Sequence, residues 1–320
     1  MNYRERHELA LMDPYHSIVR VFDCEEEKIL VGIKNVSSIP NTLMHRLEKC
    51  GYALHTIDRK SQLAGRAVDT ELINPLTGHW MSGSSSGTAV NVFAGINDLG
   101  IGNDGGGSVL APAMCVNIYG FISQLIEADR KQNIRINTDG MSAGNSLGFM
   151  TRDRKILFRA IRDSIGIEAS ATYGKIYSDR EYPELESKVI ELKDAFLPRQ
   201  ELTEYLKEIL KDCDVLILKE GPVDLQGFGD SLFGHFDERT KKIQNLSGKG
   251  YLRVCNTAGA TALAIPDTGL GCATLLICES KEEKVGKLLK AAEYIPDYKD
   301  ELIERYFLNI DSYRNEGYQL

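Results

Sequence analysis

Apolar residues along the first 60 positions recur with the spacing of strands and of one short helix. Residues 17–23 and 29–36 carry β-branched residues at alternate positions, which is typical of strands, and an acidic turn separates them. These residues supply the predicted core face of both strands: Val19, Val21, Ile29, Val31 and Ile33. Residues 40–51 show helical spacing and end in glycine, and residues 52–58 form another strand pattern. This strand–helix–strand succession indicates an α/β fold.

The rest of the chain continues with buried apolar segments and amphipathic helices, and no repeat or linker divides it. Helical patterns cover residues 88–96, 151–166, 180–212 and 281–295. Buried strand patterns cover residues 214–220 and 273–280, and a further buried segment covers 108–121. Irregular or loop structure is predicted at 61–87, 128–140 and 227–239. We therefore expect one domain over residues 1–320, with a central mixed β-sheet flanked by helices.

Composition and charge exclude several classes of function. The 320-residue chain is 42% apolar and 26% charged, which is ordinary for a globular protein. Its formal net charge of −8 disfavours a nucleic-acid partner, which would require a basic surface. No apolar run reaches the roughly 20 residues of a membrane span, and the charged N-terminus lacks the apolar stretch of a signal peptide. Together with seven scattered cysteines, these features predict a cytoplasmic protein with reduced thiols.

The six histidines show no metal-ligand spacing, so neither a metal nor another cofactor is expected. The candidate chemistry lies instead in a glycine-rich stretch, residues 100–108 (GIGNDGGGS), which raises three hypotheses. A flexible linker is disfavoured because both flanking segments are core-like rather than polar. A catalytic loop is the second hypothesis, since successive backbone N–H groups can bind an oxyanion.

A dinucleotide-binding loop is the third hypothesis. Gly100, Gly102 and Gly105 match the pattern G-x-G-x-x-G. That motif requires a strand before it and a helix directly after it. Here a helix-like segment precedes the stretch, and Pro112 follows it closely, so the match is weak.

The catalytic hypothesis requires a nucleophile and a base. Ser108 closes the glycine stretch, but a serine hydroxyl needs a neighbouring base to remove its proton. No histidine has an obvious place for this role, whereas a second serine cluster lies at residues 82–87. Lys34 lies inside an apolar strand pattern, where burial disfavours the ammonium form and lowers the pKa of the amine. Because a lysine at a strand end commonly extends to solvent, its position alone does not decide the question.

These segments together resemble the amidase signature family, hydrolases with a Ser–cis-Ser–Lys triad. SGSSSG at residues 82–87 resembles the family pattern G-G-S-S-G-G-S, and GIGNDGGGS resembles the pattern G-T-D-T-G-G-S-I-R that follows it. Ser84 and Ser108 are 24 positions apart, a spacing that is common in the family. The stretch LVGIKNVSSIPNT is similar to the family's lysine motif. Weaker matches, including SLGFMTRD and NTAGATALAIP, follow in the family order. The likeness has a motif core at about 29–166 and a C-terminal part at about 213–294.

The resemblance implies the fold of the family and a role for each matching residue. Ser108 matches the acylated nucleophile, Ser84 the bridging serine, and Lys34 the general base. The peptide bond between Gly83 and Ser84 would be cis, as in the family. Gly105, Gly106 and Gly107 match the oxyanion hole of the family. Asp104 matches the aspartate that braces the loop, and Ser85 matches a serine that helps to orient the lysine.

The implied function is hydrolysis of a carboxamide C–N bond through an acyl-enzyme. A non-hydrolytic acyl transferase and an inactive binding scaffold of the same fold are the alternatives. The chain is short for the family, because the segment after Lys34 and residues 167–213 look contracted. A more open cleft for a peptide or other large amide, or completion by a second subunit in a homodimer, would fit this contraction. Leu110 replaces the family arginine two positions after the nucleophile, and Asn103 replaces the threonine before the loop aspartate.

Overall fold

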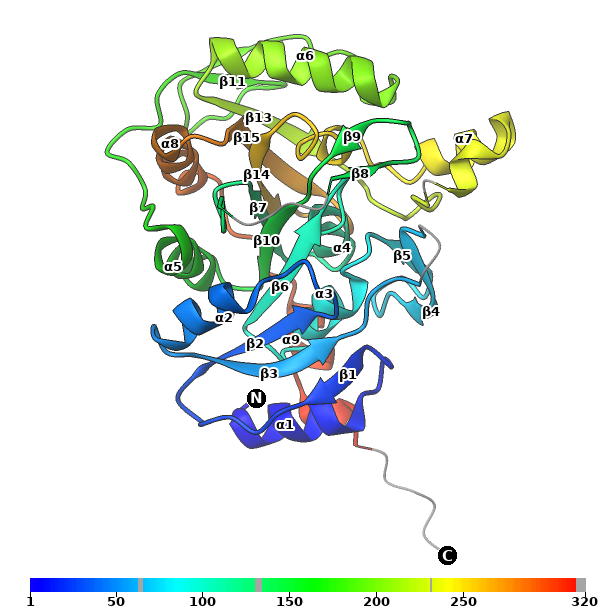
Figure 1. Ribbon diagram of the computed structural model, residues 1–320, viewed down its shortest axis with the longest axis vertical. Coiled ribbons are helices and arrows are strands. Elements are labelled where there is room, and N and C mark those ends of the chain that lie inside the picture. The colour runs from blue at the N-terminus through cyan, green and yellow to red at the C-terminus, as the bar shows by residue number, and fades with distance from the viewer. Residues whose placement is uncertain (63–65, 130–133, 231, 315–320) are drawn as a thin grey trace, which may run out of the picture.

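The computed structural model describes residues 1–62, 66–129, 134–230 and 232–314, and an eleven-stranded mixed sheet runs through it (Figure 1). In sheet order the strands are β1 (Ile18–Val21), β3 (Tyr52–Asp58), β2 (Ile29–Lys34), β6 (Leu99–Asp104), β10 (Ser146–Thr151), β7 (Tyr119–Ser123), β14 (Ala260–Pro266), β15 (Ala273–Glu279), β13 (Val215–Glu220), β11 (Ile176–Ser178) and β12 (Ser187–Val189). Strands β3, β2 and β6 run parallel, as do β13, β11 and β12, and the other neighbours are antiparallel. The predicted mixed sheet is therefore confirmed.

Helices cover both faces of the sheet. On one face lie α2 (Asn41–Glu48), α5 (Arg154–Ile165) and α8 (Glu282–Ala292), which Figure 1 shows along one side. On the other face lie α3 (Ser86–Phe93), α4 (Leu110–Cys115) and α6 (Arg199–Asp212). Further helices lie near the termini and beside the sheet: α1 (Tyr3–Met12), α7 (Glu238–Asn245) and α9 (Glu301–Phe307). Within the described residues, no helix combines the length and apolar composition needed to cross a membrane.

The two cores are separated by the alternation of side chains along the central strands. In β14, Ala262 packs in the core beneath α3, α4 and α6, whereas Leu263 packs in the core beneath α2, α5 and α8. The antiparallel register pairs Leu263 with Leu276 and Ala262 with Ile277, so β15 keeps the same division. Both strands are apolar on both faces because both faces are covered.

Removing one of these side chains is expected to destabilise the protein strongly. Leu276 is fully buried at the centre of the sheet, so Leu276→Ala leaves a cavity that costs about 2–5 kcal/mol of the free energy of unfolding. Urea unfolding of the wild type and the variant measures this difference. Leu302, which is 60% exposed, provides the matched control, and Leu302→Ala is expected to change the free energy by about 0.5 kcal/mol or less. Equal losses in the two variants would contradict this account of the core.

Several boundaries differ from the sequence-based predictions. Residues 180–212 are helical only in α6, and the first part of this range instead contains β12, the edge strand of the main sheet. Val19 is exposed rather than in the core, since β1 is the edge strand. The first five residues of GIGNDGGGS belong to β6, so only residues 105–107 lie between strand and turn. Parts of the loops predicted at 61–87, 128–140 and 227–239 fall on 63–65, 130–133 and 231, outside the described residues.

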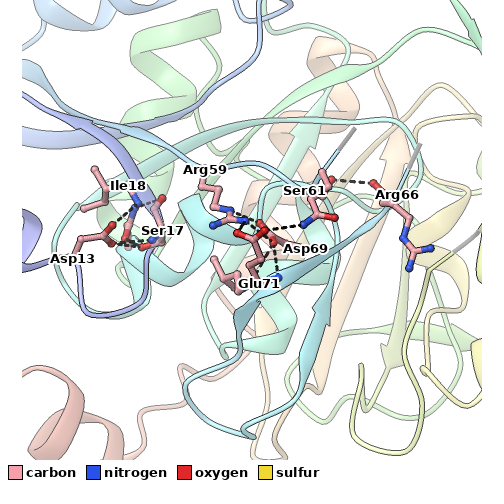
Figure 2. Close-up of polar contacts among 11 residues, drawn as sticks. Asp13, Ser17, Ile18, Arg59, Ser61, Arg66, Asp69 and Glu71 are labelled. Carbon is pink, nitrogen blue, oxygen red and sulfur yellow. Dashed lines mark hydrogen bonds and ion pairs between the residues drawn. The ribbon is translucent and has the colours of Figure 1, made fainter. Parts of the chain in front are cut away.

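Two short hairpin-like sheets lie beside the main one: β4 (Val68–Ile73) with β5 (Trp80–Ser82), and β8 (Arg135–Ile136) with β9 (Ser142–Ala143). Arg59, just after β3, attaches β4 to the main sheet (Figure 2). Its Nε donates to Asp69 at 2.8 Å, and its guanidinium also contacts Glu71. Asp69 is fully buried and accepts backbone N–H bonds from Glu71 and Leu72 as well. This ion pair therefore positions the segment that leads into the serine cluster.

Candidate active site

Lys34 lies at the end of β2, between β3 and β6, and is only 3% exposed. Its Nζ donates to Ser84 Oγ at 2.6 Å and to Asn103 Oδ1 at 2.7 Å. Burial lowers the pKa of the amine to about 7, although the negative charge of Asp104 acts in the opposite direction. Near neutral pH, a substantial fraction of Lys34 is therefore uncharged and able to accept a proton.

The serine cluster is held at its start by a buried carboxylate. Ser82 donates to Asp224 through its backbone N–H and through Oγ, the latter at 2.7 Å. Gly83 has a φ of +96°, and a Cβ at this position would clash with the ring of Pro112. A side chain is excluded here on both grounds. Ser84 follows directly and lies half-buried at the start of α3.

The expected cis bond between Gly83 and Ser84 is wrong for this structure. Among the described residues, the cis peptide bond lies between Gly221 and Pro222 instead. Gly83 instead has a positive φ, which glycine adopts without steric cost. Ser84 nevertheless contacts Lys34, so the trans bond still presents its hydroxyl to the amine.

Asp104, the last residue of β6, organises the glycine loop. Its carboxylate accepts the N–H of Gly107 at 2.6 Å and that of Val109 at 2.6 Å, and the N–H of Leu110 lies at 3.3 Å. This is the loop-bracing contact expected for Asp104. It also corrects the expectation for Gly107: because its N–H donates to Asp104, that group is not directed at an oxyanion in this structure.

Ser108 lies half-buried in the turn between the glycine loop and α4. The N–H of Ser85 donates to its backbone carbonyl at 3.2 Å, which joins the two serine segments. Ser84, Ser108, Gly105 and Gly106 all line one cavity of about 310 Å³. The structure thus places Lys34 against Ser84 and brings Ser84 and Ser108 to the same cavity.

Other residues complete the surroundings of the lysine and the loop. Ser85 does not orient Lys34 as expected, because its Oγ is buried without a hydrogen-bond partner among the described atoms. Asn103 takes that place, and its Nδ2 donates in turn to Ser38 Oγ at 3.0 Å. Asn256 Nδ2 donates to the carbonyls of Gly144 at 2.7 Å and Gly105 at 3.3 Å. The asparagine in NTAGATALAIP was the sequence feature that could have indicated this clamp.

Leu110 replaces a family arginine, and its surroundings explain how an apolar side chain is accommodated. It is fully buried in α4 and packs in the core beneath that face of the sheet. The basic side chains at the cavity come from other segments of the chain and were not predicted from the sequence: Arg66, Arg199, Lys249 and Arg253.

Comparison with known proteins finds similarity to amidases, both in a family model and in solved structures. Residues 72–156 match the family model described as Amidase, a segment that contains both serines. An amidase family protein from Bacillus anthracis has a similar structure, with a TM-score of 0.58 and 12% identity over 93% of this chain and 89% of its own. The peptide amidase of Stenotrophomonas maltophilia has a TM-score of 0.60 and 13% identity over 92% of this chain and 93% of its own. No curated protein sequence matches this chain significantly.

Proposed function

We propose, on the premise that the chain belongs to the amidase signature family, that it cleaves a carboxamide C–N bond through an acyl-enzyme on Ser108. The observation that carries this proposal is the 2.6 Å contact between Lys34 Nζ and Ser84 Oγ beside the cavity that Ser108 lines. A buried lysine with a lowered pKa, a hydroxyl in contact with it, and a second hydroxyl at the same cavity supply a base, a proton relay and a nucleophile.

In the proposed mechanism, neutral Lys34 accepts a proton from Ser84 while Ser84 accepts the proton of Ser108. The Ser108 oxygen then forms a bond to the amide carbon, and the carbonyl oxygen becomes an oxyanion. The N–H groups of Gly105, Gly106 and Ser108 are the proposed donors to this oxyanion. When the C–N bond breaks, the proton returns through Ser84 to the leaving nitrogen. Water then attacks the acyl group and releases the carboxylic acid and Ser108.

The loop hydrogen bonds support this assignment because they fix the backbone before substrate arrives. Asp104 holds the loop from within, and Asn256 binds the carbonyl of Gly105 from outside. An oxyanion hole is effective when its donors need no rearrangement during the reaction. A non-hydrolytic acyl transferase would use the same first half-reaction with another amine as acceptor.

The dinucleotide-binding alternative has less support from the geometry. A strand does precede the glycine loop, contrary to the sequence-based expectation, but Gly100 and Gly102 lie inside that strand. A Cβ on Gly100 would be crowded by Thr88 of α3, and a Cβ on Gly102 would be crowded by Ser85, the residue that caps α3. These two glycines therefore allow close packing between α3 and β6.

A fluorophosphonate probe tests the proposed function directly. The purified protein is expected to gain one probe adduct, which peptide mass mapping places on Ser108, because a basic neighbouring group activates this hydroxyl. Ser108→Ala is expected to remain unlabelled. Absence of an adduct under conditions that fully label a control amidase, or an adduct on another serine, would overturn the proposal.

A further inference from the structure

Basic side chains line the cavity at Ser108, although the chain is acidic. Four cationic side chains line it, and its described lining contains no aspartate or glutamate, in a chain of formal net charge −8. The cations come from three separate parts of the chain: Arg66, Arg199, Lys249 and Arg253. Low-dielectric walls lined by one sign of charge concentrate ligands of the opposite sign.

Arg199, the first residue of α6, lies directly over the glycine loop. Its Nη1 and Nη2 atoms are 3.1 and 3.3 Å from where a Cβ on Gly106 would stand. Its Nε lies 3.0 Å from Asp139 Oδ2, and its side chain is only 10% exposed. The ion pair therefore engages one edge of the guanidinium, while the Nη groups lie against the loop beside the nucleophile.

Lys249 also lies against the loop, where its Cε is 3.8 Å from the position of a Cβ on Gly107. Its Nζ donates to the carbonyl of Gly229 at 3.0 Å. Burial lowers the pKa of Lys249, the charge of Arg199 lowers it further, and Asp224 opposes both effects. Arg199 and Lys249 therefore lie close enough to repel one another, which an anion bound between them would offset.

The remaining two cations are held in place by protein groups. Arg253 donates through Nη2 to the carbonyl of Ala195 at 2.9 Å and also contacts that of Leu197. Arg66 forms an ion pair with Asp230, with Nε and Oδ2 2.9 Å apart. Figure 2 shows the Arg66 side chain directed away from the Arg59, Asp69 and Glu71 cluster, which it does not join. Its charge is paired with Asp230 instead.

We infer that the substrate is a small amide bearing a carboxylate, which binds beside the glycine loop between Arg199 and Lys249. This inference rests on the proposed amidase function and names its substrate class. A guanidinium binds the two oxygens of a carboxylate with matching planar geometry, and such charge-assisted bonds are the stronger ones. A cavity of about 310 Å³ is at the small end of ligand sites, which favours monoamides of dicarboxylic acids over peptides.

A charge series of matched substrates tests this inference. Ammonia release is measured for glutaramate, pentanamide and 5-aminopentanamide, which carry a negative, a neutral and a positive end group on similar chains. The wild type is expected to favour glutaramate over pentanamide by about tenfold or more in kcat/KM, as one charge-assisted interaction provides. Equal or lower kcat/KM for glutaramate would overturn the inference.

Variants connect the preference to the named residues. Arg199→Gln and Lys249→Met are each expected to lower the ratio of kcat/KM for glutaramate to kcat/KM for pentanamide by about tenfold, whatever their effect on the absolute rates. Arg180, whose ion pair with Asp179 lies outside the cavity lining, supplies the matched control, and Arg180→Gln is expected to keep the wild-type preference. If both cavity variants kept the wild-type preference for glutaramate over pentanamide, the carboxylate would bind elsewhere and the inference would be overturned.

Protection from the fluorophosphonate probe gives a second measurement that needs no turnover and no variant. Glutarate is expected to slow labelling of the wild type, whereas glutaronitrile, a neutral molecule of the same chain length without an amide, is expected to protect at least about tenfold less at the same concentration. Protection by inorganic phosphate equal to that by glutarate would indicate a general anion site and overturn the carboxylate assignment. Full labelling without any charge preference would overturn this inference alone, whereas absence of labelling would overturn the proposed function itself.

Discussion

Replacing Ser108 with alanine is expected to lower kcat/KM for amide hydrolysis by on the order of 10⁴-fold or more. Without Oγ no acyl-enzyme forms, and only substrate binding and the oxyanion donors of the loop remain to accelerate direct attack by water. The fold should persist, because Asp104 braces the loop through backbone N–H groups that the substitution leaves in place. Ammonia release and the burst of p-nitrophenol from an activated ester measure the loss.

The control for this experiment is a serine from the same region of the sequence. Ser86 is fully buried in α3, and its Oγ has no hydrogen-bond partner among the described atoms. Ser86→Ala therefore removes no hydrogen bond, and kcat/KM is expected to stay within about twofold of the wild-type value. If Ser108→Ala kept more than about one hundredth of the wild-type kcat/KM, or lost the burst no more than Ser86→Ala, Ser108 would not be the nucleophile.

The sequence indicates the proposed base and nucleophile, Lys34 and Ser108, because local patterns constrain their surroundings. Lys34 lies within an apolar run that predicts a strand, and the structure forms that strand and buries the lysine. The 24-residue interval between Ser84 and Ser108 spans α3 and β6, which return the chain to the same cavity. The strands at 17–23, 29–36, 52–58, 214–220 and 273–280 and several of the helices follow from the spacing of apolar residues. The central strands β6, β10, β7 and β14 were not predicted, because they are buried on both faces and so show no alternation of apolar and polar residues.

The remaining features of the site depend on contacts that no local pattern encodes. Asn103 rather than Ser85 bonds to Lys34, and the Oγ of Ser85 has no hydrogen-bond partner among the described atoms. Gly107 is one of three consecutive glycines, and only the folded position of Asp104 distinguishes its N–H from the others. Arg199 and Lys249 lie 50 residues apart in sequence, and they meet because α6 and the segment after α7 both reach the glycine loop.

Replacing Lys34 with methionine is expected to lower the rate of acylation by about 10²–10⁴-fold, the usual contribution of a general base. Methionine keeps the apolar length of the side chain but cannot accept a proton from Ser84. In the wild type, the second-order rate of fluorophosphonate labelling should rise with pH through about 7 and level off above it, because the neutral amine is the active form. The variant should lack this rise. A wild-type midpoint near 10, or the same rise in Lys34→Met, would contradict the assignment of Lys34 as base.

The same lowered pKa has a consequence for stability that does not depend on activity. Below pH 7 the amine is protonated in both the folded and the unfolded chain, so folding bears the full cost of burying the charge. Between about pH 7 and the ordinary lysine value of 10.5, the unfolded chain binds a proton that the folded chain has lost. The free energy of unfolding of the wild type should therefore rise relative to Lys34→Met across this window. Urea unfolding of both proteins at pH 6, 7, 8, 9 and 10 measures the difference, and a constant difference would show that Lys34 retains its ordinary pKa.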